Sequence, residues 1–420
     1  MLKTSLQMAF KVLLRRKFFT FASLFGISFT LMVLMVVVSA LDHRFSPDAP
    51  QSNSDRMLFI DRMTIKGPTT ESGGSRVSIS SAGYRFLDEN VRDLPHLERV
   101  SLYSDDRRAA TYIDGVKHAL SIKYTDGAYW QIFDFDFLEG GSFTDQDEKD
   151  ANPVIVISQK LARKLYGETS ALDQTLVADG TTFRVIGVVA DTSSFQEATH
   201  ANGWAPSSTA RSQAYRDNFI GGYHAVILAK SSSDRPLIQA ELQSRIDQLQ
   251  VPDEYAWSES VFCYALTLFE ELSADQFSDY TGEPRPTKLR LILGVSALLF
   301  MLLPSLNIMN LNLSRTLERS SEIGVRRAFG AQRSSLLGQF LVENIVLTLL
   351  GGLLGLALAA WVLHLFNTYE IAPGVDFGLN FRVFAWSLAL ALAFGVLSGL
   401  YPAWRLSRLH PVTALRAKLR

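Results

Sequence analysis

Long apolar segments alternate with mixed segments along the chain. Four mostly hydrophobic blocks cover residues 18–41, 289–313, 336–366 and 381–403. Each block reaches the roughly 20 residues that a helix needs to cross the hydrocarbon core of a bilayer. Residues 42–288 instead mix apolar and polar positions as a water-soluble domain does. The pattern predicts four transmembrane helices, with one large domain inserted between helices 1 and 2.

The inserted domain has the pattern of an α+β fold. Two β-α-β units stand near its start and its end. The strand patterns lie at 57–61, 98–103, 223–229 and 258–268, and the amphipathic helices lie at 82–94 and 235–249. We expect these two units to form one lobe, which is interrupted by a second lobe at about 109–200.

The second lobe, at about 109–200, is richer in strand signals. Its strand patterns lie at 119–124, 154–157, 175–178 and 183–189, and a short helix is expected at 159–166. Asp179-Gly180 separates two alternating runs and predicts a hairpin, because a type I′ turn needs positive φ at both central residues. Residues 192–218 are rich in Ser, Thr, Ala, Gln and Asn and are interpreted as a mobile loop.

Basic residues gather beside the apolar blocks in three segments. They are Lys3, Lys11, Arg15, Arg16 and Lys17; Arg315, Arg319, Arg326, Arg327 and Arg333; and Arg405, Arg408, Arg416, Lys418 and Arg420. The positive-inside rule places all three segments in the cytoplasm, and the loop at 367–380, which lacks Lys and Arg, outside. The predicted fold class is therefore a membrane α-helical protein with four transmembrane helices, cytoplasmic termini and a large α+β extracytoplasmic domain at 42–288.

A cleaved signal peptide is the alternative for the N-terminus, since residues 38–40 loosely resemble a small-residue cleavage site. The apolar stretch at 18–40 exceeds the roughly 7–15 residues of a signal-peptide core. An uncleaved membrane anchor is therefore expected, and residues 1–41 form a cytoplasmic N-terminal helix followed by the first span.

Composition and charge exclude two classes of protein. The hydrophobic fraction of 47% and mean hydropathy of +0.11 argue against an ordinary cytosolic enzyme. The net charge of −1, from 41 basic and 42 acidic residues, gives no basic field for nucleic acid. The single cysteine, Cys263, allows no disulfide within the chain and is interpreted as a buried small hydrophobe.

No catalytic or metal-binding motif stands out in the sequence. The seven histidines lack metal-ligand spacing, and the acidic run at 145–150 does not fit a calcium loop and is interpreted as a solvated turn. The sequence contains neither a GxSxG elbow nor a GxxxxGK[ST] phosphate loop. The chain is therefore predicted to be non-catalytic, and any ATP-driven work would depend on a partner that binds ATP.

The segment at 317–335 separates the second and third apolar blocks. Its acidic residues come first and its basic residues follow, as the helix dipole favours, so we expect a short amphipathic cytoplasmic helix. The simpler alternative is a membrane-surface helix whose arginines bind anionic lipid.

Several spaced motifs nevertheless resemble those of one family. They are NIMN at 307–310, Glu318-Arg319, EIGVRRAFGA at 322–331, QFLVE at 339–343, YPA at 401–403 and LHPVTALR at 409–416. Together they resemble the FtsX-type permease domain of macrolide-exporter-like (MacB-like) ABC transporters, here at 289–403 with a cytoplasmic tail at 404–420. Residues 130–143, with LEGG at 138–141, and then 154–167 and VIGVV at 185–189 resemble the periplasmic core domain of the same family.

The resemblance implies a permease that works with an ABC ATP-binding subunit and a second permease chain, the same or a paralogue. ATP and Mg would bind in that partner, this chain would bind no cofactor or metal, and a periplasmic adaptor would join the complex in the inner membrane. The residues implied in ATPase coupling are Glu318, Arg319, Glu322, Ile323, Gly324, Arg326, Arg327 and Gly330. Two features depart from the family pattern: Ser321 stands where a basic residue is common, and a fused ATP-binding domain is absent from this sequence.

Three functions remain open within this resemblance. Export or efflux by mechanotransmission, in which the permease acts as a lever on its outer domain, is the leading expectation. Lipoprotein release from the membrane is one alternative. Regulation of an extracytoplasmic cell-wall hydrolase is the other.

Polar and small residues inside the apolar blocks are candidates for helix packing. Asn307 and Asn310 lie three residues apart on one helix face and either hydrogen-bond across a dimer interface or bond their own backbone. Two small-xxx-small pairs, Gly351 with Gly355 and Gly395 with Gly399, are expected in packed helices or in the seam of a dimer.

Overall fold

The computed structural model describes most of the domain expected at 42–288 and two long apolar helices. The described residues are 17–45, 47–69, 73–113, 115–300, 302, 333–371, 374–375, 377–379, 381–382, 384–389, 391–393 and 396. The chain divides into two compact units, one formed by His43–Arg290 with Ala372–Val375 and the other by the remaining residues.

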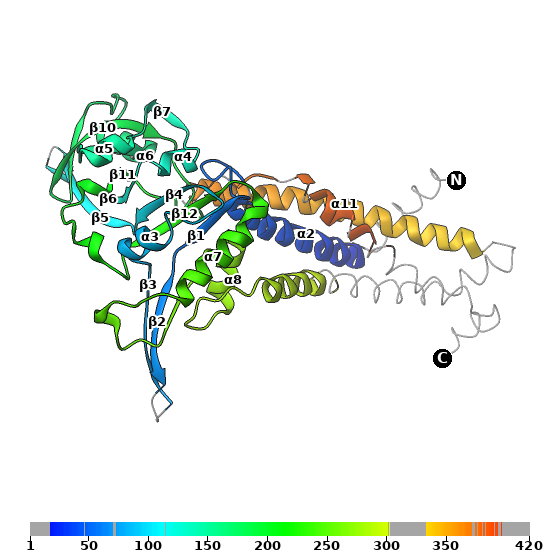
Figure 1. Cartoon of the computed structure of the whole chain (residues 1–420). Coiled ribbons are helices and arrows are strands. Elements are labelled where there is room, and N and C mark those ends of the chain that lie inside the picture. Colours follow the sequence, from blue (N-terminus) through cyan, green and yellow to red (C-terminus); the bar gives the residue numbers. More distant parts are fainter. Residues whose placement is uncertain are drawn as a thin grey trace. The chain divides into compact units, whose positions relative to one another are not determined.

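A mixed ten-stranded sheet forms the centre of the first unit (Figure 1). Its order is β1 (Met57–Ile60), β12 (Tyr223–Ala229), β4 (Leu97–Ser104), β6 (Val116–Thr125), β11 (Gly203–Pro206), β8 (Val154–Ser158), β10 (Thr181–Val189) and β7 (Phe137–Gly140), with β5 (Arg107–Ile113) on β6 and β9 (Thr175–Ala178) on β10. A separate three-stranded sheet holds β13 (Ser260–Cys263), β2 (Met63–Thr69) and β3 (Ser75–Ser80).

Both faces of the large sheet are buried along β1, β8 and most of β12, which explains the continuous apolar runs of these strands. Along β1, Leu58 contributes to one core and Phe59 to the other, as the two-residue period of a strand requires. The helices α3 (Tyr84–Asn90), α6 (Gln159–Tyr166) and α7 (Arg235–Asp247) supply apolar side chains to the first core. The second core is aromatic and centres on α4 (Tyr129–Ile132) and the fully buried Trp204.

The expected β-α-β unit at the start of the domain is present as β1, α3 and β4, although β12 lies between its two strands. The second expected β-α-β unit, near the end of the domain, is present only in part. The strand at 258–268 is reduced to β13, which pairs with β2 instead of joining the large sheet. The reason is local: Thr267 accepts a hydrogen bond from the backbone N–H of Glu270 in a capping box, so α8 (Leu268–Phe277) begins there.

The hairpin at Asp179-Gly180 is confirmed. Ala178 pairs with Thr181 across a two-residue loop, and φ is 51° at Asp179 and 80° at Gly180. Cys263 is buried, as expected.

The interpretation of residues 192–218 as a mobile loop is wrong. Within it, β11 pairs parallel with β6 and antiparallel with β8, and it therefore joins the two halves of the large sheet. The acidic run at 145–150 is mostly exposed, but it forms the short helix α5 (Asp145–Lys149) because Thr144 and Asp147 make a capping box at its N-terminus. Glu148 is half-buried and accepts hydrogen bonds from the backbone N–H and the hydroxyl of Ser208.

The second compact unit contains α2 (Lys17–Phe45) as far as Asp42, and α11 (Arg333–Thr368); the last three residues of α2 belong to the first unit. Within the described residues, two helical stretches are long and apolar enough to cross a membrane, Thr20–Phe45 and Leu341–Thr368. The other two predicted spans lie partly outside the described residues. Residues 286–300 are helical, as are most described positions between 381 and 396.

Candidate functional site

The structure describes only two of the residues that the sequence singled out. Glu318, Arg319, Glu322, Ile323, Gly324, Arg326, Arg327, Gly330, Asn307, Asn310, Gly395 and Gly399 lie outside the described residues. Gly351 and Gly355 lie on the side of α11 that faces α2. A Cβ at Gly351 would be 2.7 Å from Ile27 Cγ2, and one at Gly355 would be 3.0 Å from the Ser28 carbonyl oxygen.

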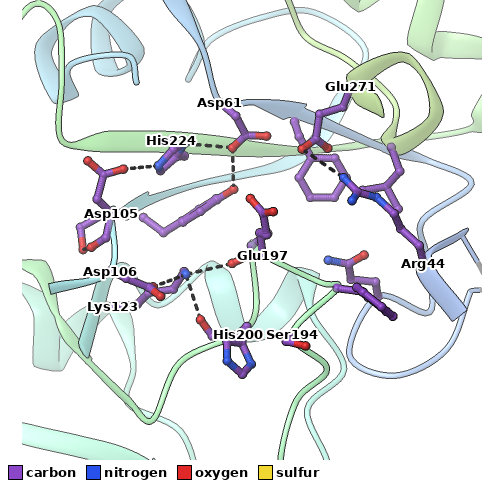
Figure 2. Close-up of a pocket in the computed structure, with 17 residues that line it drawn as sticks. Arg44, Asp61, Asp105, Asp106, Lys123, Ser194, Glu197, His200, His224 and Glu271 are labelled. Carbon is purple, nitrogen blue, oxygen red and sulfur yellow. Dashed lines mark hydrogen bonds and ion pairs between the residues drawn. The ribbon is translucent and has the colours of Figure 1, made fainter. Parts of the chain in front are cut away.

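A cavity of about 340 Å³, lined by both charged and apolar side chains, lies in the first compact unit, where α2 ends and α8 begins (Figure 2). Arg44 comes from the last turn of α2, and Glu271 comes from α8. Asp61 follows β1, and His224 lies on β12. Residues of the segment at 194–200 line another side of the cavity. The cavity therefore collects side chains from parts of the chain that are far apart in sequence.

His224 is held as an imidazolium between two carboxylates. Its Nδ1 lies 2.9 Å from Asp61 Oδ1, and its Nε2 contacts Asp105 Oδ1. Tyr103 stacks on the imidazole with ring centroids 5.2 Å apart and donates a hydrogen bond to Asp61. Burial alone would lower the pKa of His224, but Asp105 and Asp61 outweigh it and raise the pKa to about 9.

Lys123 ties the segment at 194–200 to strand β6. The side chain is buried, and its ammonium contacts the Asp106 carboxylate. Its remaining hydrogen bonds go to the carbonyl oxygens of Glu197, at 2.9 Å, and His200, at 3.0 Å. All three donors of the ammonium are thus used, and the segment is held by a charged anchor.

The end of α2 meets α8 and the segment at 194–200 within this unit. Arg44 Nη2 lies 4.0 Å from Glu271 Oε1, and the rings of Phe45 and Phe269 are 5.8 Å apart. His43 packs edge-on against Phe195, with ring centroids 6.4 Å apart. Burial raises the pKa of Glu271, and nearby carboxylates add to that shift.

The arrangement is that of a binding cavity. Among the described residues, no group of three or more His, Cys, Asp or Glu side chains is placed to hold a metal ion. The charged side chains mainly hold one another, and they join two helix ends to the sheet.

The sequence pattern does not predict this cavity, and the spacing of the seven histidines gives His224 no special role. A signal for it exists, since Asp61 directly follows β1 and Asp105-Asp106 directly follow β4. Polar residues at the ends of neighbouring strands mark a possible site, but the pairing of these strands with β12 is not visible in the sequence.

Two family models match the chain in succession. The MacB-like periplasmic core domain matches residues 20–245, and the FtsX-like permease C-terminal domain matches residues 294–411. The first match alone covers more than half of the chain.

Relatives that match over most of their length include the ABC transporter permease YvrN of Bacillus subtilis (strain 168), which is 25% identical over 98% of both chains. The permease YknZ of the same organism is 26% identical over 80% of both chains. The macrolide export ATP-binding/permease protein MacB of Bdellovibrio bacteriovorus is 27% identical over 83% of this chain, which spans 51% of the length of that relative.

Among solved structures, the periplasmic region of MacB from Actinobacillus actinomycetemcomitans is similar. It is 16% identical, with a TM-score of 0.34, over 49% of this chain and 88% of that chain. From the family matches, the chain belongs to the MacB/FtsX family of ABC transporter permeases, membrane proteins with a periplasmic core domain.

Proposed function

We propose that this chain is an export permease whose outer domain is moved by ATP hydrolysis in an ABC ATP-binding subunit. The observation that carries the proposal is the succession of two family matches on one chain, a periplasmic core domain at 20–245 and an FtsX-like permease domain at 294–411. Export is favoured because relatives are named for macrolide export and for pyoverdine export.

The proposed topology has four spans, cytoplasmic termini and an external domain at 42–288. It is supported by two apolar helices of spanning length, by the helical residues at 286–300 and by the shorter apolar helix Phe384–Ala393. The basic residues that flank the apolar blocks support the orientation. The site of action is then the inner membrane and the space outside it.

In the proposed complex, the segment at 317–335 docks on the ATP-binding subunit, where ATP and Mg bind. A second permease chain completes the membrane part, and an adaptor outside the membrane receives the cargo. Glu322 and Arg326 are four residues apart, so on a helix they lie on one face and can contact the ATP-binding subunit together.

Movement would reach the outer domain through the ends of the first two spans. Arg44 and Phe45 at the end of α2 contact α8, and α8 leads within ten residues to the helix at 286–300. A shift of either helix would therefore act on Glu271, Phe269 and the segment at 194–200. This is the lever-like action that mechanotransmission requires.

A double substitution tests this coupling. In Glu322→Ala with Arg326→Ala, ATP should no longer change hydrogen exchange in residues 192–200 and 268–277, whereas the wild-type complex should show at least a twofold change. The matched control is Lys418→Ala with Arg420→Ala, which removes charge from the same side of the membrane. An ATP response in the double variant equal to that of the wild type would remove the coupling role from this segment.

A further inference from the structure

The cavity beside α8 has more negative than positive charge. Five carboxyl groups line it, those of Asp61, Asp105, Asp106, Glu197 and Glu271, against the cations Arg44, Lys123 and protonated His224. Burial raises the pKa of Glu271 well above its usual value, and the other four carboxylates alone outnumber the three cations. His224 engages Asp61 and Asp105, and Lys123 engages Asp106. Arg44 reaches Glu271 only at 4.0 Å.

Glu197 is the one of these five residues whose carboxylate takes part in none of the ion pairs just named. Only its backbone carbonyl is engaged, by Lys123, and none of the ion pairs among the described residues includes its side chain. Figure 2 shows this carboxylate pointing into the cavity, on the side of Asp61. Together with Glu271, it offers a place for a cation to enter.

Two buried donors line the same cavity without an acceptor. Gln51 is 1% exposed, and its amide nitrogen has no hydrogen-bond partner among the described residues. The Nε atom of Arg44 is also buried and has no hydrogen-bond partner among the described residues. A buried donor that lacks an acceptor costs about 1–3 kcal/mol, so these two atoms favour a ligand that brings an acceptor oxygen.

The size and walls of the cavity fit a small molecule. Its volume of about 340 Å³ is within the range of small-ligand sites. A second cavity of about 210 Å³ shares Asp61, Glu197 and Glu271 with it. Phe59, Phe195 and Leu268 give the first cavity an apolar side.

We propose that this cavity binds a small zwitterion, with its ammonium on Glu197 and Glu271 and its adjacent oxyanion on Gln51 Nε2 and Arg44 Nε. A ligand with only one of the two charges would leave either the carboxylates or the buried donors unpaired. Two sources share this chemistry, a free amino acid and an ethanolamine phosphate headgroup. Because Arg44 belongs to α2 and Glu271 to α8, the ligand bridges the two helix ends. The cavity would bind this ligand whichever way the permease moves its cargo.

The test measures binding to the full-length protein in phosphatidylglycerol nanodiscs, which contain no zwitterionic lipid. The probes for calorimetry are L-leucine, N-acetyl-L-leucine, L-leucinamide and O-phosphoethanolamine. We expect L-leucine to bind at least tenfold more tightly than both derivatives, each of which lacks one charge. Tighter binding of O-phosphoethanolamine than of L-leucine would also support the site and would assign it to a lipid headgroup.

Substitutions then locate the binding. Glu197→Gln should weaken binding of the favoured probe at least tenfold. Gln51→Met should weaken it equally, measured on protein whose thermal unfolding matches that of the wild type. The control is Glu168→Gln, an exposed carboxylate outside the cavity. The proposal is overturned if no probe binds, if a singly charged derivative binds as tightly as L-leucine, or if Glu197→Gln binds like the wild type.

Discussion

At the scale of single residues, the outer domain depends on charged groups that are buried together. His224 lies near the start of β12 and Lys123 near the end of β6, both interior strands of the large sheet. Each is satisfied by carboxylates or carbonyl oxygens. Removing one member of such a group leaves its partners desolvated and unpaired, which costs more than the contact itself contributes.

The first prediction concerns pH. The pKa of His224 is raised to about 9 in the folded protein from an ordinary value of 6.5. Its stabilising contribution is therefore complete below pH 6.5 and is lost as the pH rises through 9. The full contribution is about 3 kcal/mol, at about 1.4 kcal/mol for each unit of pKa.

His224→Gln should remove this contribution. In urea unfolding of the full-length protein, followed by tryptophan fluorescence, the stability gap between wild type and variant should shrink as the pH rises from 6.5 to 9. His118→Gln, which removes a histidine outside the cavity, should show no such trend. A gap that stays constant over this range would contradict the ion-paired state of His224.

The second prediction concerns the anchor of the segment at 194–200. Lys123→Met leaves the carbonyl oxygens of Glu197 and His200 without their hydrogen-bond donor. The amide hydrogens of the segment should therefore exchange at least tenfold faster than in the wild type. Lys117→Met removes an exposed lysine from the same strand and serves as the control. Equal exchange in the two variants would show that Lys123 does not hold the segment.

At the scale of elements, the close approach of α2 and α11 depends on small residues. Gly355→Ala would place a methyl group 3.0 Å from both the Ser28 carbonyl oxygen and Leu31 Cβ. We expect a loss of about 1–3 kcal/mol, because the helices must separate to admit the methyl group. Thermal unfolding in detergent measures the change.

Gly338→Ala is the matched control, since no described atom lies within 4 Å of its added Cβ. Alanine is the better helix former by up to about 1 kcal/mol, so this variant should be unchanged or slightly more stable. If both variants melt alike, the contact between the two helices does not limit stability.

Sequence patterns predicted the elements that are defined locally. The strand predicted at 154–157, the helix at 159–166 and the hairpin at 179–180 are set by nearby residues, and the structure contains all three. Strand β11 was missed because its four residues, Gly203–Pro206, become a strand only through pairing with β6 and β8. The cavity was missed for the same reason, since contacts between distant segments create it.

At the scale of the whole molecule, the proposed orientation can be tested with fusions. A reporter that is active only outside the cytoplasm should give signal when fused at residue 150 and none at residue 330. The reason is that residue 150 lies in the domain at 42–288, whereas basic residues surround 330. The reverse pattern would contradict the topology.

The central claim is that an ABC ATP-binding subunit drives this permease. The most direct measurement is affinity purification of the full-length chain from its native membranes, followed by mass spectrometry and an ATPase assay of the purified complex. We predict that a P-loop ATPase co-purifies and that the complex hydrolyses ATP, together with an adaptor if the output is export. Recovery of the intact chain with no ATPase would contradict the account.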